Sequence, residues 1–127
     1  MKRKDKKCLN CGIDCRYKYC SNQCQAIVRQ TKIIEKWIID PNSVVEKSGL
    51  CHRTIKDFLR ELFDNKCQLC KWSEINPTTG IVPLEINHVD GDGFNNHLNN
   101  LQLICPNCHS LTHNFKALNK GSKRIRK

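Results

Sequence analysis

Cys67-Gln68-Leu69-Cys70 opens the most informative stretch of this chain, and Cys105-Pro106-Asn107-Cys108-His109-Ser110-Leu111-Thr112-His113 closes it. Between them lies Leu84-Glu85-Ile86-Asn87-His88-Val89-Asp90-Gly91-Asp92. Two Cys-x-x-Cys pairs supply four thiolates, which complete and close the tetrahedral shell of a zinc ion. One imidazole follows the central apolar run, and two more lie four residues apart at the end. The stretch therefore predicts a second, more open metal site and a candidate general base beside a structural zinc at Cys67, Cys70, Cys105 and Cys108.

The chain is small and basic. Its 127 residues suffice for one domain or two very small ones, and only 6% of them are aromatic, so metal ions are expected to replace part of a core. Met1-Lys2-Arg3-Lys4-Asp5 leads into no apolar signal peptide, and no segment reaches the ~18 apolar residues of a membrane span. The 10 cysteines are therefore expected to bind zinc in a reducing cytoplasm rather than to form disulfides. The net charge of +10 favours a polyanionic partner, with nucleic acid first and a merely basic soluble protein as the plain alternative.

A second cysteine group lies near the N-terminus. It follows a charged arm at residues 1–7, whose basic side chains either follow phosphates or are simply solvated. Cys15 fits the spacing of the group less well and is expected to stay free. Ser21 is a candidate N-cap for the helix that follows. The residues expected to bind this second structural zinc are Cys8, Cys11, Cys20 and Cys24.

Two helices are expected between the cysteine groups. Apolar residues recur at helical intervals from Gln25 to Asp40, where Asp40-Pro41 ends the helix, and Trp37 is expected to anchor its packing. A second helix is expected from Arg53 to Phe63. It should bury Ile55, Phe58, Leu59, Leu62 and Phe63. Its other face, which either contacts a DNA backbone or faces solvent, carries Arg53, Lys56 and Arg60.

The C-terminal part is predicted to be a hairpin followed by a helix. Alternation from Val82 to His88 predicts a strand at a sheet edge because Pro83 cannot donate a ladder hydrogen bond, and Leu101 to Ile104 predicts its partner. Asp90-Gly91-Asp92-Gly93 is either a turn or a source of carboxylate ligands, with the turn favoured. The helix is expected to run from Cys108 to about Leu118, so that two imidazoles share one face and either bind one cation or face solvent. Those imidazoles belong to His109 and His113.

These residues resemble the HNH endonuclease family, whose nuclease core is the ββα-metal fold. The resemblance covers residues 67–115 and rests on the two cysteine pairs, the His88 segment, Asn99-Asn100-Leu101 and the final Cys-His, in the family's order and spacing. Residues 8–37 resemble the small zinc finger that precedes many HNH proteins of phages and prophages. The expected fold is a small zinc-stapled α+β chain. Its expected parts are a basic arm (1–7), a zinc finger with its helix (8–40), a helical connector (41–65), the HNH core (66–119) and a basic tail (120–127).

The resemblance implies a role for each candidate site residue. His88 matches the general base, and Asn100 matches the asparagine that braces the loop and orients that base. His109 and His113 match ligands of a catalytic divalent cation such as Mg²⁺, Mn²⁺ or another transition metal. Asn87 stands where many members carry a charged or imidazole ligand, and its carbonyl oxygen brings no charge to the metal site.

The predicted function is metal-dependent hydrolysis of DNA phosphodiester bonds, leaving 5′-phosphate and 3′-hydroxyl ends as the resemblance implies. An imidazole with an ordinary pKa of about 6.5 is partly unprotonated at neutral pH and suits a general base. One site per chain favours nicking of double-stranded DNA, and paired cuts would need a dimer or two successive events. Binding should be largely electrostatic and weaken steeply with salt; the tail adds further backbone candidates at Lys123 and Arg124.

Two alternatives to this function follow from the same sequence. The main one is a catalytically inactive zinc-finger DNA-binding protein, which the neutral Asn87 favours; another is a nuclease or binder of RNA. No membrane partner is expected, whereas a dimer or a phage partner protein is compatible with the chain. The expected location is the cytoplasm of a bacterial host, as a phage or prophage protein.

Overall fold

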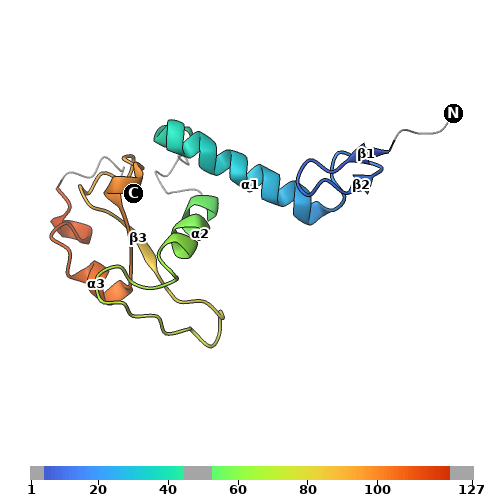
Figure 1. The fold of residues 1–127 in the computed structure, drawn as a ribbon. Helices are drawn as coiled ribbons and strands as arrows, with labels where there is room; N and C mark the ends of the chain where they lie inside the picture. The colour runs from blue at the N-terminus through green and yellow to red at the C-terminus, as the bar shows by residue number, and fades with distance from the viewer. Residues whose placement is uncertain (1–4, 45–52, 121–127) are drawn as a thin grey trace.

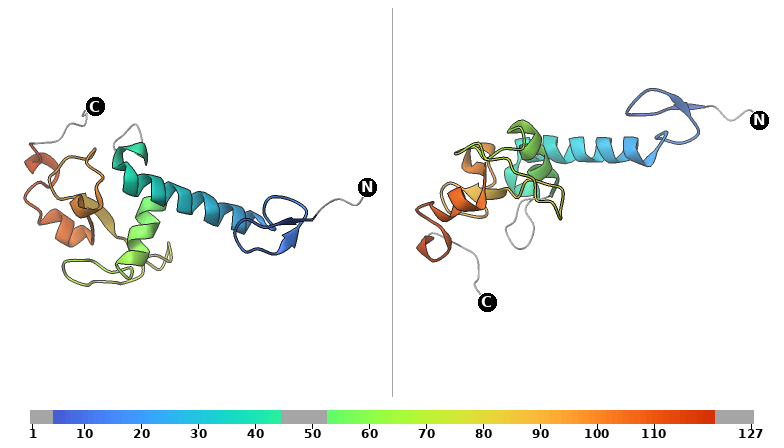
Figure 2. Two further views of the ribbon diagram at one scale, coloured as in Figure 1. Left: turned by 45° about the horizontal axis from the view of Figure 1, so that its top comes forward. Right: turned by 90° about the horizontal axis from the view of Figure 1, so that it is seen from below.

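The computed structural model describes residues 5–44 and 53–120, and it is a small α+β structure (Figure 1). An N-terminal cysteine knuckle lies at one end of a long helix, α1, and the other end of α1 lies against the C-terminal part of the chain (Figures 1 and 2). No helix among the described residues has both the length and the hydrophobicity needed to cross a membrane. Several residues considered above lie outside the described ranges: residues 1–4 of the arm, and Lys123 and Arg124 of the tail.

The knuckle and α1 form because of local signals in the sequence. A short antiparallel pair, β1 (Lys6–Lys7) and β2 (Asp14–Cys15), closes the knuckle. Ser21 caps α1 (Asn22–Ile39), as predicted, because its Oγ accepts a hydrogen bond from the Cys24 N–H at 3.2 Å. The cap starts the helix one turn earlier than the apolar periodicity indicated. A 3-10 turn, η1 (Pro41–Val44), follows the predicted stop at Asp40-Pro41.

α1 and α2 (Arg53–Leu62) join in one buried cluster. Trp37 is 1% exposed and meets Phe58 edge-on, with ring centroids 6.0 Å apart, which confirms its role as a packing anchor. The prediction that Leu62 is buried is wrong, because its side chain is 50% exposed. The chain reverses immediately after α2 and turns Phe63 to the core in its place. The fully buried members of the cluster are Trp37, Ile55, Leu59 and Leu101.

The hairpin consists of β3 (Glu85–His88) and β4 (Leu101–Ile104), antiparallel, with Glu85 opposite Ile104 and His88 opposite Leu101. β4 has the predicted bounds, but β3 begins later than predicted. Two hydrogen bonds explain the late start, since the Val82 carbonyl accepts from Arg60 Nη1 at 2.8 Å and from the Leu84 N–H at 2.8 Å. The carbonyl of Val82 is therefore bound outside the sheet.

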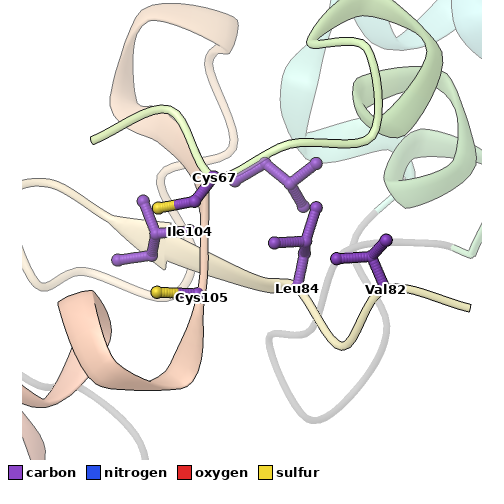
Figure 3. Close-up of a cluster of buried hydrophobic side chains, with 6 residues drawn as sticks. Cys67, Val82, Leu84, Ile104 and Cys105 are labelled. Atoms are coloured by element: carbon purple, nitrogen blue, oxygen red, sulfur yellow. The ribbon is translucent and has the colours of Figure 1, made fainter. Parts of the chain in front are cut away.

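A second buried cluster lies beside the hairpin and includes two cysteines (Figure 3). The sulfur atoms of Cys67 and Cys105 point away from Leu84 and Val82 (Figure 3). Trp72 packs against this cluster, as predicted for a residue beside the knuckle. The cysteine group is thus continuous with the hydrophobic core. The buried members are Cys67, Val82, Leu84, Leu103, Ile104 and Cys105.

The last helix is much shorter than predicted. α3 (Pro106–Ser110) ends where the Leu111 N–H bonds the Cys108 carbonyl at 3.2 Å, and only a 3-10 turn, η3 (Lys116–Leu118), follows. Asn114 holds the intervening chain on the hairpin, because its Nδ2 donates to the carbonyls of His88 and Val89 at 3.3 Å each. The expectation that His109 and His113 share a helix face is therefore wrong, since His113 lies beyond the end of α3.

Candidate metal centres and catalytic site

The N-terminal cysteines form a compact sulfur group. The ligand atoms of Cys8, Cys11, Cys20 and Cys24 all lie within 4.8 Å of one another. The Sγ atoms of Cys11 and Cys20 are 3.6 Å apart, and those of Cys20 and Cys24 are 3.5 Å apart. These distances are close to the ~3.8 Å edge of a tetrahedron with Zn–S bonds of about 2.3 Å. The geometry suits zinc, and Cys15 stays outside the group, as expected.

The charge state of this group also suits a cation. The backbone N–H of Cys11 is the main cause that lowers the pKa of Cys8 to about 6. The side chain of Asn10, whose Nδ2 lies 3.3 Å from Cys24 Sγ, lowers the pKa of Cys24. The neighbouring Cys24 sulfur raises the pKa of Cys20 to about 12. The shifts favour thiolates at Cys8 and Cys24 and a protonated thiol at Cys20. A divalent cation would allow all four sulfurs to ionise.

The core cysteines form an equivalent group. Their ligand atoms also lie within 4.8 Å of one another, and the Sγ atoms of Cys70 and Cys105 are 3.7 Å apart. Burial raises the pKa of Cys67, but the backbone N–H groups around its sulfur outweigh burial and lower it to about 6. The Cys70 sulfur raises the pKa of Cys108 to about 12. Within the described residues, these two cysteine groups are the only clusters of three or more His, Cys, Asp or Glu with this spacing.

The two knuckles share one backbone design. In each, the residue after the second cysteine has a positive φ: Gly12 at 77° and Lys71 at 67°. The N–H of that residue donates to the carbonyl of the first cysteine at 2.9 Å in both knuckles. The N–H of the first cysteine donates to the carbonyl of the residue that follows the turn residue: Cys8 to Ile13, and Cys67 to Trp72. The turn leaves the backbone N–H groups free to face the sulfur atoms.

His88 is held at the end of β3 by an asparagine. Its Nε2 lies 2.9 Å from Asn96 Oδ1, and the ring is half-buried while Asn96 is fully buried. An amide oxygen can only accept, so Nε2 carries the proton in this contact and Nδ1 keeps a lone pair. The backbone of Asn96 is fixed as well, because its carbonyl accepts from Trp37 Nε1 at 2.7 Å. The candidate base therefore has one defined tautomer and a rigid support.

Asn100 braces the loop between the strands. Its Oδ1 accepts from the Asp90 N–H at 3.0 Å, and its Nδ2 donates to Asp90 Oδ1 at 2.9 Å and to the Asn95 carbonyl at 2.8 Å. Its carbonyl accepts from the N–H of Val89, the residue after His88, at 2.9 Å. The direct side-chain contact to the His88 ring comes from Asn96 instead.

The loop around Asp90 is a turn. The Asp90 and Asp92 side chains accept from backbone N–H groups two residues ahead, at 2.8 Å and 3.0 Å. Burial raises the pKa of Asp90, but hydrogen bonds, first from Asn95, outweigh burial and lower it. These carboxylates stabilise a turn, which is the interpretation that the sequence favoured over a role as metal ligands.

His109, on α3, is oriented by a carboxylate on β3. Its Nδ1 lies 2.5 Å from Glu85 Oε2, and the ring meets Phe115 edge-on at 5.3 Å between centroids. With Nδ1 engaged by Glu85, Nε2 is the nitrogen left for a cation. Histidine ligands of metals commonly donate their second ring N–H to a carboxylate in this way. This geometry fits the role of a metal ligand.

Asn87 and His113 border one shared cavity of about 340 Å³ between the hairpin and the chain after α3. Asn87 lies on the same face of β3 as Glu85, because strand side chains alternate. Its Nδ2 donates to Gln102 Oε1 at 3.2 Å, which leaves its own carbonyl oxygen as the remaining donor for a metal. His113 is exposed. His88 lies on the opposite face of β3, at the strand's last position.

Comparison with known proteins identifies this part of the chain. Residues 67–115 match the family model described as HNH endonuclease. This segment is therefore similar to HNH endonucleases. A named relative, "H-N-H endonuclease F-TflIV" of Escherichia phage T5, is 42% identical over 60 residues, which cover 45% of this chain and 24% of that protein. The chain thus spans about a quarter of the relative's length. No solved structure gave a significant match.

These matches confirm the predicted HNH resemblance and fit the expected phage association. They do not favour the alternative of a silent zinc-finger protein. The sulfur group at Cys8–Cys24 lies outside the matched HNH segment and is consistent with a separate zinc site.

Most of the basic α2 side chains that were candidates for contact with a DNA backbone interact within the protein instead. Arg60 holds Val82 and also donates to Asn65 Oδ1 at 3.1 Å. Lys56 is half-buried, and burial, followed by the nearby Arg60, lowers its pKa. Arg53 is exposed and lies 3.9 Å from Asp57. Of the three, Arg53 is the most accessible to a DNA backbone.

Two residues that contact the candidate site histidines were missed from the sequence alone. Glu85 is an ordinary polar position in an alternating strand, and its contact to His109 depends on how α3 returns to β3. Asn96 is one of several asparagines in the loop, and only its burial separates it from its neighbours. The alternation of side chains along a strand was the one sequence pattern that could have indicated Glu85, because it places Glu85 on the same face as Asn87.

Proposed function

We propose that this chain is a metal-dependent DNA endonuclease, a hydrolase in which β3, β4 and α3 form the ββα-metal core. One observation carries the proposal. Within the segment that matches the HNH family, His88 ends β3 with its Nε2 on Asn96, so its Nδ1 lone pair is available to a water molecule.

His88 is the general base in this proposal. Its Nδ1 takes a proton from water as the water oxygen forms a bond to phosphorus. The bond from phosphorus to the 3′ oxygen breaks, and that oxygen takes up a proton to leave a 3′-hydroxyl opposite a 5′-phosphate. Asn96 keeps Nε2–H in place and stabilises the imidazolium. Asn100 keeps the loop that carries Asn96 closed.

Three residues would hold the catalytic cation: His109 through Nε2, Asn87 through its amide oxygen, and His113. When bound there, a divalent cation would supply positive charge to the scissile phosphate and to the leaving oxygen. Glu85 orients His109 and adds a negative charge to a ligand set that otherwise has none. The two cysteine groups would each hold a structural zinc.

The substrate of this proposal is double-stranded DNA, cut one strand at a time. The single candidate base per chain supports nicking, and a double-strand cut would come from two chains or two events. The proposed parts are those expected from the sequence: finger and α1 (8–40), connector (41–65) and HNH core (66–119), with basic segments at both ends (1–7 and 120–127).

Conversion of supercoiled plasmid to the nicked form tests this function. The zinc-loaded chain should nick plasmid with Mg²⁺, Mn²⁺ or Ni²⁺ and not with excess EDTA. His88→Ala should slow nicking by about 10²–10⁴-fold, because general-base catalysis contributes that much. His97→Ala is the matched control, since His97 is an exposed histidine of the same loop, and it should stay within about twofold of the parent.

Nicking by His88→Ala at the parent rate would remove His88 from the mechanism. DNA binding without nicking in any of the three metals would instead favour the silent zinc-finger alternative.

A further inference from the structure

Helix α1 separates two grooves of opposite charge. The groove on one side has a volume of about 780 Å³ and is bordered by Asp57, Glu61 and Asp64, with Arg60 as its basic residue. The groove on the other side has a volume of about 580 Å³ and is bordered by no acidic residue. The α1 residues of the two grooves lie about half a turn apart around the helix, at 100° per residue. The acidic residues that border these grooves therefore all lie on one side of α1.

The second groove, called here the α1 basic groove, is strongly positive. Its α1 residues Arg29, Lys32 and Lys36 are exposed and follow one another at intervals of three and four, so they share one face. Lys18 and the half-buried Tyr19, from the knuckle, extend the groove toward the finger. The ion pairs found between described residues do not include Arg29, Lys32 or Lys36. Like charges at this spacing destabilise an isolated helix, so this face favours an external anion.

We propose that the α1 basic groove binds the phosphate backbone of the DNA substrate, outside the candidate catalytic site. This inference rests on the proposed function for the choice of DNA. The groove extends from the finger toward the HNH segment, because α1 joins the two (Figures 1 and 2).

The dimensions support a run of phosphates rather than one small anion. The α1 part of the groove, from Gln25 to Lys36, is about 16 Å long at 1.5 Å per residue. That length equals the axial rise of about five nucleotides of one strand, at 3.4 Å each. Exposed lysine and arginine heads on flexible stems can neutralise phosphates along that length without reading bases. The groove would therefore contribute affinity and position, not sequence recognition.

The test measures binding of a 30-base-pair duplex by gel mobility shift at several salt concentrations. The protein is the zinc-loaded chain with His88→Ala, so that the duplex stays intact. The test variant adds R29Q/K32Q, and the control adds R16Q/K66Q, an exposed arginine and an exposed lysine outside the groove. Both variants lose the same charge, so they differ only in where it is lost. Circular dichroism and zinc content confirm that each variant is folded.

Two lost phosphate contacts should make the negative slope of log K against log salt shallower by about 2 and weaken binding about 10- to 100-fold near 0.1 M salt. The control should stay within about threefold with an unchanged slope. Equal weakening in both variants, or none in R29Q/K32Q, would overturn the groove, as would displacement by RNA in preference to DNA. Plasmid nicking by the chain without these substitutions is measured in parallel. If the chain nicks plasmid but R29Q/K32Q does not weaken DNA binding, only the proposal of the α1 basic groove is rejected. If R29Q/K32Q weakens DNA binding but the chain does not nick plasmid, only the proposed endonuclease activity is rejected.

Discussion

The two cysteine groups have nearly the same local geometry but different attachments to the fold. The N-terminal group closes a short loop, and among its members only Cys8 and Cys24 are buried. The core group joins the end of the α2 turn to the start of α3, and two of its members belong to the hydrophobic cluster beside the hairpin. One site therefore holds a loop, whereas the other holds a domain core. The consequence of losing the metal should differ accordingly.

The largest difference is expected on removing one ligand from each group. Cys105→Ser should abolish cooperative unfolding of the HNH segment and plasmid nicking, because structural zinc supplies roughly 10–16 kcal/mol of apparent binding free energy that is also folding free energy. Cys11→Ser, in the other group, should lose one zinc and keep most of the unfolding transition. Zinc content and thermal unfolding followed by circular dichroism measure both. Equal losses of stability in the two variants would show that the attachments are equivalent after all.

The next effect tests how firmly the N-terminal part is joined to the HNH part. Trp37→Ala should lower the free energy of unfolding by about 3–5 kcal/mol, since it removes a buried aromatic side chain from the cluster between α1, α2 and β4. Ile38→Ala is the control, because Ile38 is 63% exposed and should change stability by less than about 0.5 kcal/mol. Urea unfolding gives both values. A Trp37→Ala variant as stable as Ile38→Ala would mean that the cluster does not unite the two parts.

A smaller effect concerns the residue that follows each group's last cysteine. After Cys24 it is Gln25, whereas after Cys108 it is His109, paired with Glu85. Glu85→Gln keeps a hydrogen-bond acceptor but removes the charge, so half-maximal nicking should need about 10–100 times more divalent cation. Glu74→Gln, an exposed acid in the loop before the hairpin, should leave this requirement unchanged. The same shift in both variants would assign the effect to general electrostatics.

The smallest effect compares the two turn residues. Gly12→Ala should destabilise the N-terminal knuckle by about 1 kcal/mol, since φ is 77° there and an added Cβ meets nothing within 4 Å. Lys71→Gly should stabilise the core knuckle by up to about 1 kcal/mol, because a left-handed lysine is strained by ~1–2 kcal/mol and glycine returns part of that gain as entropy. Thermal unfolding at fixed zinc concentration measures both, and a stabilising Gly12→Ala would contradict the shared turn geometry.

Local chemistry explains which parts of this fold were predictable. Cysteine spacing predicted both sulfur groups, Ser21 and Asp40-Pro41 predicted the ends of α1 closely, and β4 was predicted to the residue. Each of these signals acts within a few positions of the chain. The HNH resemblance worked for the same reason, since its residues cluster in short segments.

Long-range hydrogen bonds explain what was not predictable. The sequence pattern extends β3 back to Val82, but Arg60 donates a hydrogen bond to the Val82 carbonyl and β3 begins later. Asn114 donates to the His88 carbonyl at the end of β3, and α3 ends before this residue. The displacement of His113 from the helix follows from the second contact. The contacts of Glu85 with His109 and of Asn96 with His88 could be seen only in the folded chain.

One asparagine joins two rings that are far apart in the sequence. Asn96 accepts from the Trp37 indole through its main chain and meets His88 through its side chain. A ligand that moves Trp37 would therefore disturb the support of this imidazole, and the same disturbance would change the polarity around the indole. In a Trp72→Phe variant, the fluorescence emission wavelength of Trp37 would therefore report whether Asn96 still supports the His88 ring.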